Sequence, residues 1–518
     1  MQFIKNAINF RKSKKIIERI LLLILTVLFL LPAIVSCGDK SGNDGGNQNN
    51  TGANQNGKDT DGGGETASDS APTEAYIYPQ MDGGGADFTF LAPTTTWFYY
   101  TDIVKDEMSG EVLDDAIYTR NRFIESQFNI NFKEVSLDIG QIIPQLKKVV
   151  LSGEDVYDAS FCPVYCGGNI GSLITQNFFY NLNENPMLNL DEKWWNQTMR
   201  KEASIGKGDK LYYAGCDIDI LTLQSVSCVY FNQDMMTNLG LELPYNAARE
   251  GKWTFDLFQQ YMKSGASLNG ADSFKWEVGG KALYGFTSYE DSVTSLLEGS
   301  GERFIITDSE GMPHPGINGE RFINVLTKLQ DMLQLQNGEF LYSNGDHATG
   351  NHYEPIFRDG RALLAIGELK ATDVFREMDA TFGIVPIPKY DENQQDYYSH
   401  LIFAASVLVI PVTNPRVDFT GAVLDAMAYV SNRDVTPVLF DVSVSQKRLR
   451  NEDSIEMLQI IKNSGSFDIG LAYGWTSGFY DAIRGSIGQG KKFDIASQID
   501  KYLDKINANI DKTMELFE

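Results

Sequence analysis

Residues 211–258, LYYAGCDIDILTLQSVSCVYFNQDMMTNLGLELPYNAAREGKWTFDLF, decide the fold of this chain. Two short runs of apolar and aromatic residues, 211–214 and 224–231, are typical of buried strands. A polar break that carries Asp217 and Asp219 separates the two runs. The sequence therefore predicts two strands joined by a short segment with two carboxylates.

Helical sequence follows the second run. Residues 232–239 are typical of a short helix, and Gly240 is suited to end it because glycine adopts a positive φ without strain. After a loop, Thr254 is suited to cap the start of another helix. Trp253 and Phe258 stand at the spacing of a hydrophobic staple, in which two apolar side chains pack across a helix start.

This order of elements, with YFNQDMM, LGL and GKWTFD in it, closely resembles the central segment of the family 1 extracellular solute-binding proteins. These are the maltose-binding-protein-like receptors of ABC importers. The resemblance implies an α/β fold, a type II periplasmic-binding-protein-like clamp of two lobes. Each lobe would be a mixed sheet flanked by helices, joined by a hinge of several strands, with the ligand in the cleft. Further segments resemble the family in the same order: FNINFKEV at 128–135, Trp194–Trp195, FRDGRALLA at 357–365, FGIVPIPK at 382–389 and SGFYDAIR at 477–484.

The N-terminus has the features of a lipoprotein signal peptide. A basic start precedes an apolar run at 20–35, which is shorter than the roughly 20 residues of a membrane-spanning helix. The run ends in Ile-Val-Ser before Cys37, a pattern typical of a bacterial lipobox. We expect cleavage after residue 36, a lipid on Cys37, and a chain held at the outer face of the cytoplasmic membrane. The alternative is an uncleaved N-terminal anchor.

The expected domains follow from composition and from the resemblance. Residues 37–85 begin with the lipidated cysteine and are rich in Gly, Asn and Asp, which is typical of a disordered tether. Lobe 1 is expected at 86–216, with about 410–450 returning to it. Lobe 2 is expected at 217–409, with about 451–518 returning to it.

Charge and cysteine content exclude some function classes. The formal net charge of −25 argues against nucleic acid and against an anionic lipid surface as partners. Four cysteines besides Cys37 could form disulfides in an exported protein or remain free thiols. With four histidines and none of them near these cysteines, a zinc site is disfavoured, and we expect no metal or cofactor. The four cysteines are Cys162, Cys166, Cys216 and Cys228.

Aromatic and carboxylate side chains are the expected ligand contacts. An aromatic ring covers the apolar face of a sugar, and carboxylates accept hydrogen bonds from its hydroxyl groups. The resemblance places Tyr480 at a sugar-stacking position, with Trp475 beside it, although both could instead be core aromatics. The expected ligand-binding residues are Trp97, Tyr165, Asp217, Asp219, Tyr289, Glu368, Trp475 and Tyr480.

The sequence thus predicts a lipid-anchored, monomeric and non-enzymatic receptor. It would capture a sugar or oligosaccharide and deliver it to the transmembrane subunits of an ABC permease. One alternative is a secreted carbohydrate-active enzyme, in which Asp217 and Asp219 would act as acid and base. Another is the same fold binding a charged non-sugar solute such as a polyamine.

Overall fold

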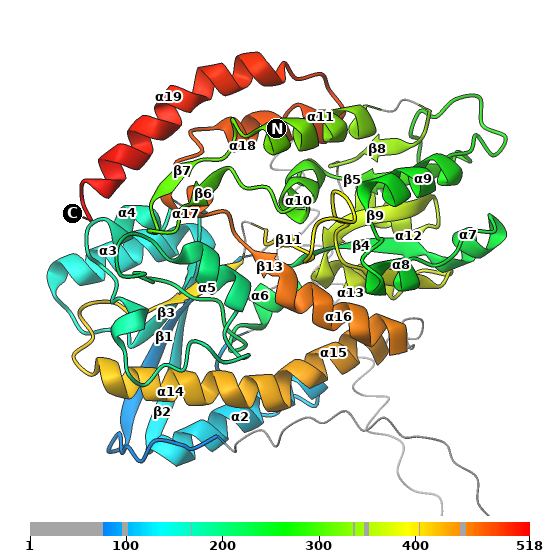
Figure 1. Ribbon diagram of the computed structural model, residues 1–518. Coiled ribbons are helices and arrows are strands. Elements are labelled where there is room, and N and C mark those ends of the chain that lie inside the picture. Colours follow the sequence, from blue (N-terminus) through cyan, green and yellow to red (C-terminus); the bar gives the residue numbers. More distant parts are fainter. Residues whose placement is uncertain are drawn as a thin grey trace, which may run out of the picture. The chain divides into compact units, whose positions relative to one another are not determined.

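The computed structural model describes residues 76–95, 102–166, 168–334, 337–345, 352–402, 405–445 and 452–517. Residues 74–518 form one compact unit (Figure 1). No helix in this described part is long and apolar enough to cross a membrane. The expected signal peptide, Cys37 and Trp97 lie outside the described residues.

The first sheet has four strands in the order β12-β3-β1-β2. β1 pairs in parallel with both β2 and β3, because helices return the chain to the same end of the sheet, and β12 is antiparallel to β3. Helices α2, α3 and α14 accompany this sheet in the lower left of Figure 1. The bounds are β1 Ala86–Thr94, α2 Val112–Phe128, β2 Ile130–Asp138, α3 Ile142–Ser152, β3 Ala159–Pro163, β12 Ser406–Val409 and α14 Val417–Val430.

The second sheet has five strands in the order β10-β4-β9-β5-β8 and lies in the right half of Figure 1. β4 is antiparallel to both of its neighbours, whereas β5 is parallel to β9 and β8. Every residue of β4 is buried, as expected for a central strand covered on both faces. The bounds are β4 Ser227–Asn232, α9 Phe255–Gly265, β5 Tyr284–Ser288, α10 Ser292–Gly299, α11 Glu320–Leu333, β8 Phe340–Tyr342, α12 Tyr353–Arg358, β9 Ala362–Glu368 and β10 Phe382–Val385.

Three short segments lie side by side between the two sheets and form the hinge. β11 (Ser399–His400) pairs in parallel with β13 (Gly465–Ser466), which follows α16 (Glu452–Ser464). The Ile402 amide donates to the Ser225 carbonyl oxygen at 3.3 Å, which joins the third segment to these two. The hinge is therefore built from residues far apart in the sequence.

The elements predicted for residues 232–258 are confirmed. Helix α7 (Gln233–Asn238) ends just before Gly240, which has a φ of 66°. Helix α9 starts directly after Thr254, although the Thr254 side chain makes no capping hydrogen bond. The rings of Trp253 and Phe258 lie edge to face with centroids 5.9 Å apart, as expected for the staple.

The strand predicted at 211–214 is wrong, because only Ala214 forms a bridge, to Leu408. The strand predicted at 224–231 begins later, because a short helix, α6 (Ile220–Gln224), precedes β4. The Asp219 carboxylate accepts a hydrogen bond from the Leu221 amide at 2.9 Å and so stabilises the start of this helix.

Two expected domain boundaries also shift. The ring of Tyr76 stacks on Tyr429 with centroids 4.4 Å apart, and its hydroxyl donates to Asp425 at 3.0 Å. Tyr76, expected from the sequence in the tether at 37–85, therefore packs on the folded unit. β12 belongs to the first sheet, so the segment expected in lobe 2 up to residue 409 leaves that lobe before Ser406.

The C-terminal helix α19 (Ile495–Met514) packs along β7 (Pro313–Pro315), α11 and α18 (Phe479–Arg484). It crosses the upper left of Figure 1. Its buried side chains are Ile499, Ile506, Ile510 and Met514.

The four described cysteines are free thiols, which answers the alternative left open by the sequence. Cys162, Cys216 and Cys228 are buried, and burial raises the pKa of each thiol well above its ordinary value. They therefore behave as small apolar core residues.

Candidate ligand-binding site

A cavity of about 560 Å³ opens where the chain leaves β3 and faces helix α18. The carboxyl end of a strand in an open α/β sheet is the usual place for a ligand, because the loops there are free to carry polar side chains. Its polar and aromatic lining residues include Tyr165, Asn169, Thr476, Ser477, Tyr480, Asp481 and Arg484.

Tyr165 and Tyr480 meet at this cavity. Their hydroxyl oxygens are 3.3 Å apart, and their rings lie edge to face with centroids 6.1 Å apart. Tyr480 follows a tight turn in which Ser477 and Gly478 both have positive φ values, 56° and 91°. This turn starts α18 and directs Tyr480 toward the segment after β3. Two residues predicted from sequence, 315 positions apart, are thus brought together.

Arg484 supplies the positive charge of the cavity wall. Its guanidinium lies 5.2 Å from the centre of the Tyr480 ring and pairs with Asp291, with Asp481 at 3.6 Å and with Glu290 at 3.8 Å. Burial acts to lower the pKa of Arg484, but Asp291, Tyr480 and Tyr165 together outweigh burial and hold that pKa above its ordinary value. The guanidinium therefore stays charged and fixed in place.

A second group of predicted residues surrounds Glu368 at the end of β9. The Tyr289 hydroxyl donates to the Glu368 carboxylate, and the Tyr353 hydroxyl donates to it at 3.2 Å. Tyr289 and Tyr353 stack with centroids 5.4 Å apart and planes at 20°. Burial raises the pKa of Glu368, and the hydrogen bond from Tyr289 opposes that rise.

The two groups are electrostatic neighbours. Burial raises the pKa of Tyr289 well above its ordinary value, and the charges of Glu368 and Asp291 and the Tyr480 hydroxyl add to the rise. Asp291 also pairs with Arg484 at the cavity wall. Four of the predicted ligand residues, Tyr165, Tyr289, Glu368 and Tyr480, therefore belong to one region.

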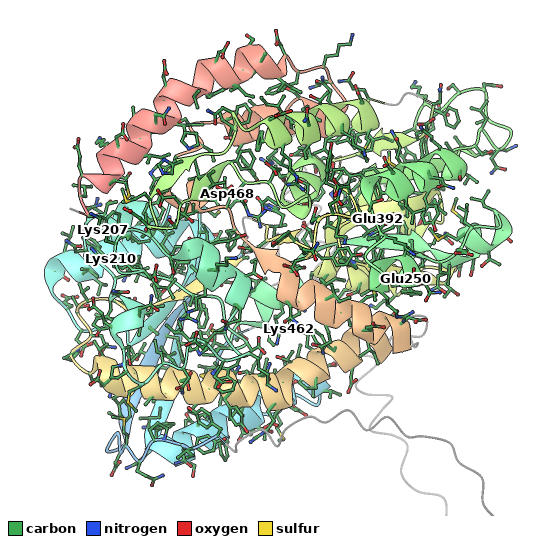
Figure 2. All side chains as sticks on the ribbon, in the orientation of Figure 1. Lys207, Lys210, Glu250, Glu392, Lys462 and Asp468 are labelled. Atoms are coloured by element: carbon green, nitrogen blue, oxygen red, sulfur yellow. The ribbon has the colours of Figure 1, made fainter. Side chains whose placement is uncertain are left out.

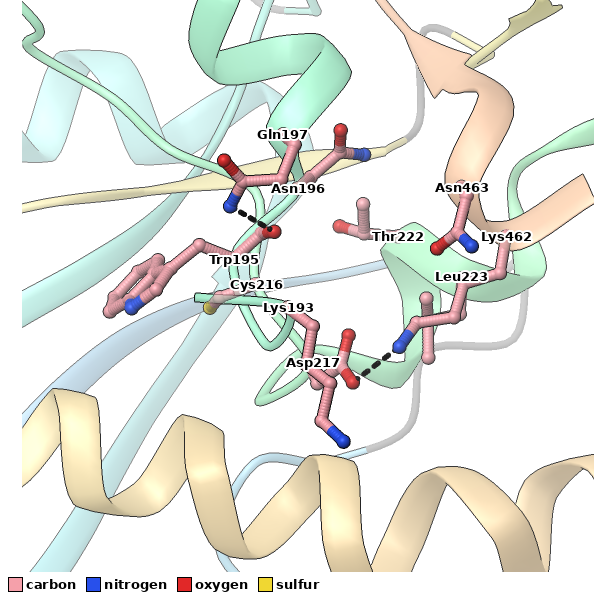
Figure 3. Close-up of a pocket in the computed structure, with 10 residues that line it drawn as sticks. All are labelled: Lys193, Trp195, Asn196, Gln197, Cys216, Asp217, Thr222, Leu223, Lys462 and Asn463. Atoms are coloured by element: carbon pink, nitrogen blue, oxygen red, sulfur yellow. Dashed lines mark hydrogen bonds and ion pairs between the residues drawn. The ribbon is translucent and has the colours of Figure 1, made fainter. Parts of the chain in front are cut away.

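Asp217 lies at a different cavity of about 230 Å³, drawn in Figure 3. Its carboxylate faces Lys462 there, and the Lys462 ammonium donates to it at 2.7 Å. Asn432 donates to the same oxygen at 2.6 Å. This carboxylate is neutralised by a partly buried lysine and is separate from the tyrosine cavity.

Asp219 and Trp475 are held by contacts inside the fold. Besides capping α6, the Asp219 carboxylate accepts hydrogen bonds from Thr222 and Ser406. Trp475 is 1% exposed, stacks on Tyr473 with centroids 4.5 Å apart, and donates to the Thr513 hydroxyl at 2.9 Å. Neither side chain lines the tyrosine cavity.

Sequence reasoning missed Arg484 as a site residue. A signal was present, because Tyr480 and Arg484 are four residues apart, which places them on one face of a helix. Asn169 and Thr476 were also missed, and nothing in their local sequence distinguishes them from other polar loop residues.

The structure resembles known solute-binding proteins. The cyclic α-maltosyl-1,6-maltose binding protein of Arthrobacter globiformis aligns with a TM-score of 0.56 and 11% identity, covering 83% of this chain and 100% of that one. The maltose-binding periplasmic protein of Listeria monocytogenes, in complex with maltose, aligns with a TM-score of 0.51 and 13% identity over 82% and 98%. UgpB of Mycobacterium tuberculosis, in complex with glycerophosphocholine, aligns with a TM-score of 0.51 and 12% identity over 83% and 99%.

No protein-family model and no curated protein sequence matches the chain. At such low identity the structural likeness establishes the fold. The two-lobed, periplasmic-binding-protein-like architecture expected from the sequence resemblance is confirmed.

Proposed function

We propose that this chain is an extracytoplasmic receptor that captures a sugar or oligosaccharide between its two lobes and delivers it to an ABC-type permease. Cys37 would carry the lipid that holds the receptor at the membrane. The observation that carries the proposal is the meeting of Tyr165 and Tyr480 at one cavity, with Arg484 against the Tyr480 ring.

The chemistry of this cavity suits a neutral polyhydroxylated ligand. Tyr165 is partly exposed and offers an apolar ring face and a hydroxyl group, the edge of the buried Tyr480 ring borders the cavity beside it, and Asn169 and Thr476 offer uncharged hydrogen-bonding groups. Sugars need both kinds of contact because a pyranose has an apolar face and a polar rim. The neighbours that bind maltose and a cyclic maltosyl sugar support the same class of ligand.

The balance of charge favours a sugar over a polyamine. Arg484 and Asp481 are the charged residues among those that line the cavity, and they pair with each other at 3.6 Å. The lining itself therefore holds no surplus carboxylate for a polycation, although Asp291 and Glu290, which also pair with Arg484, are not among the lining residues. UgpB, which has a similar fold, is in complex with glycerophosphocholine, so the fold by itself does not select sugars. The choice of ligand must therefore depend on the residues that line the cavity.

The two carboxylates expected to act as acid and base in the enzyme alternative are engaged in contacts within the fold. Asp217 is paired with Lys462, and Asp219 caps a helix while accepting from Thr222 and Ser406. Neither carboxylate lines the tyrosine cavity, so neither is placed to transfer a proton to a ligand held there.

The test is a thermal-shift screen of mono- and oligosaccharides, polyamines and amino acids, followed by calorimetry on the best ligand. The Tyr480→Ala variant should lose about 5- to 150-fold in affinity, because stacking and aromatic contacts contribute about 1–3 kcal/mol. Tyr118→Ala is the matched control, since Tyr118 is a half-buried tyrosine on α2 that does not line the cavity, and its affinity should be unchanged.

Two results would contradict the proposal. A shift produced by polyamines alone would keep the receptor and reject the sugar. Release of reducing ends from a glycan incubated with the protein would favour the enzyme alternative.

A further inference from the structure

A buried histidine and a buried glutamate pair at the hinge. His400, on β11, is 0% exposed, and Glu298, near the end of α10, is 1% exposed. The His400 Nδ1 atom lies 3.1 Å from a Glu298 carboxylate oxygen. Their contact is an ion pair, because the ring nitrogens of His400 and the carboxylate oxygens of Glu298 make no hydrogen bond of standard geometry to any described residue. Each group therefore depends on the other for compensation of its charge.

This pair connects the hinge to the proposed ligand cavity. β11 pairs with β13, and the next amide, that of Leu401, donates to the Ser466 carbonyl oxygen at 3.0 Å. On its other side, the His400 ring lies with its centroid 6.4 Å from that of Tyr480. A change in the charge of His400 would therefore act on both the hinge and a residue that lines the cavity.

Acidic groups face the pair from several elements. Asp291, at the start of α10, is 1% exposed and pairs with Arg484 of α18, and its other carboxylate oxygen has no hydrogen-bond partner among the described residues. β4 contributes an uncharged group, the Ser227 hydroxyl, which accepts from Ser295 at 3.2 Å.

Asp468 faces the pair from the segment that follows β13, and Figure 2 labels it near the centre of the view. It is 0% exposed and accepts hydrogen bonds from the amides of Phe304 at 2.5 Å and Gly470 at 2.7 Å. Burial and the Glu298 carboxylate raise the pKa of Asp468 to about 7, and Arg303 opposes that rise.

Two guanidinium groups do not fully compensate these acids. Arg303 pairs with Glu202 of α5 (Gln197–Ala203) at 2.7 Å, and it also donates to the backbone oxygen of Glu298 at 3.0 Å. Arg484 is engaged by Asp291. A protonated imidazole is the remaining positive charge in contact with the Glu298 carboxylate within the described part of the chain.

The direction of the pH effect follows from these charges. Burial acts to lower the pKa of His400, but Glu298 and then Asp291 outweigh burial, so that pKa stands above its ordinary value. The contribution of the pair is therefore complete below about pH 6.5, the ordinary histidine pKa, and is lost as the pH rises through the raised value. Asp468 loses its proton near pH 7, which adds a second buried negative charge over the same range.

We propose that the His400–Glu298 pair couples a proton to lobe closure, so that the receptor is closed and holds its ligand at acidic pH and opens as the pH rises. The part concerning the ligand rests on the proposed function. The physical reason is that a deprotonated pair leaves the Glu298 carboxylate buried without a cation. Glu298 lies on α10 and His400 on the hinge strand β11, so a hinge movement that draws the two apart admits water to this carboxylate and relieves the cost.

The experiment uses the ligand-free protein at pH 6.0 and pH 8.5. We expect a larger radius of gyration in solution scattering and a melting temperature lower by several degrees at pH 8.5. The Glu298→Gln variant should lose both differences, because a neutral amide no longer stabilises the imidazolium and no longer raises the pKa of Asp468. If maltose binds, its Kd should rise with pH, by at most tenfold per pH unit, which is the limit for one linked proton.

Asp308→Asn is the matched control. Asp308 pairs with His314 at 3.0 Å, but both side chains are about half exposed, so this variant should keep the pH dependence of the wild type. Equal scattering and equal melting at the two pH values in the wild type would overturn the proposal, as would an unchanged pH dependence in Glu298→Gln. A pH dependence abolished by Glu298→Gln in a protein that binds no sugar would reject the sugar and keep the proton coupling.

If the Glu298→Gln variant does not fold, the proposal can be tested by nuclear magnetic resonance titration of the histidines in the unaltered protein. The chain has four histidines, and in the unaltered protein one imidazole should remain protonated above pH 6.5. If every imidazole is neutral at pH 7, the proposal is rejected.

Discussion

Asp425, in α14, is a buried carboxylate that is compensated by neutral donors. It accepts hydrogen bonds from the indole groups of Trp194 at 3.0 Å and Trp195 at 2.9 Å, from the Asn189 side chain at 2.6 Å, and from the Tyr76 hydroxyl at 3.0 Å. These donors come from two parts of the chain, Tyr76 and the segment 189–195. One residue therefore attaches both the paired tryptophans and the start of the folded unit to the first lobe.

Replacing this carboxylate should cost substantial stability. In Asp425→Asn, an amide NH2 would face donors that need an acceptor, so at least one buried donor would lose its partner. We expect a loss of about 3 kcal/mol in the free energy of unfolding, because unsatisfied buried polar groups cost about 1–3 kcal/mol each. Denaturant titration measures this loss.

Asp418→Asn is the control for this prediction, since Asp418 is exposed on the same helix. Its effect should stay within about 0.5 kcal/mol. Equal unfolding midpoints for the two variants would show that the hydrogen bonds to Asp425 contribute little.

At the scale of elements, α19 shows how helical spacing attaches a long helix. Ile499, Ile506 and Ile510 are its buried isoleucines, and intervals of seven and four residues place them on one face. At the C-terminal end of this helix, the Phe517 ring lies 6.0 Å from that of Tyr212, and Trp475 donates to Thr513. Trp475 therefore serves to attach α19 rather than to bind a ligand.

The packing of α19 can be tested with two neighbouring substitutions. Ile506 is 0% exposed, so Ile506→Ala should lower the free energy of unfolding by about 2–4 kcal/mol through lost burial and a cavity. Lys505 is exposed on the same helix, and Lys505→Ala should change that free energy by less than about 0.5 kcal/mol. Similar losses in the two variants would mean that α19 is not packed as described.

At the scale of the whole molecule, the described part of the folded unit begins at Tyr76. A chain that starts at Glu74 should melt at the same temperature as one that starts at Cys37. A chain that starts at Asp82 should melt several degrees lower, because it lacks the ring of Tyr76 on Tyr429 and its hydrogen bond to Asp425. Differential scanning calorimetry of the three chains decides this, and equal melting of all three would contradict it.

Part of the candidate site was predictable because its signals are local. Tyr480 was found from the motif at 477–484, and Tyr165 from its position just after a predicted strand. Asp219 was correctly placed in the polar break, but its role was not predictable. The Ser406 hydroxyl that occupies its carboxylate lies 187 residues away, so only the folded chain brings the two together.

The sequence by itself determined the strands and helices with strong periodicity, the staple at Trp253 and Phe258, and the type of fold, because these depend on neighbours within a few residues. Only the tertiary structure decided which aromatic and acidic side chains border the cavity. Trp475 and Tyr480 are five residues apart, yet one packs under α19 and the other lines the cavity. The fold also places Lys462 beside Asp217, and this ion pair neutralises the Asp217 carboxylate. Burial and charge compensation are settled by partners distant in sequence, and local spacing carries no information about those partners.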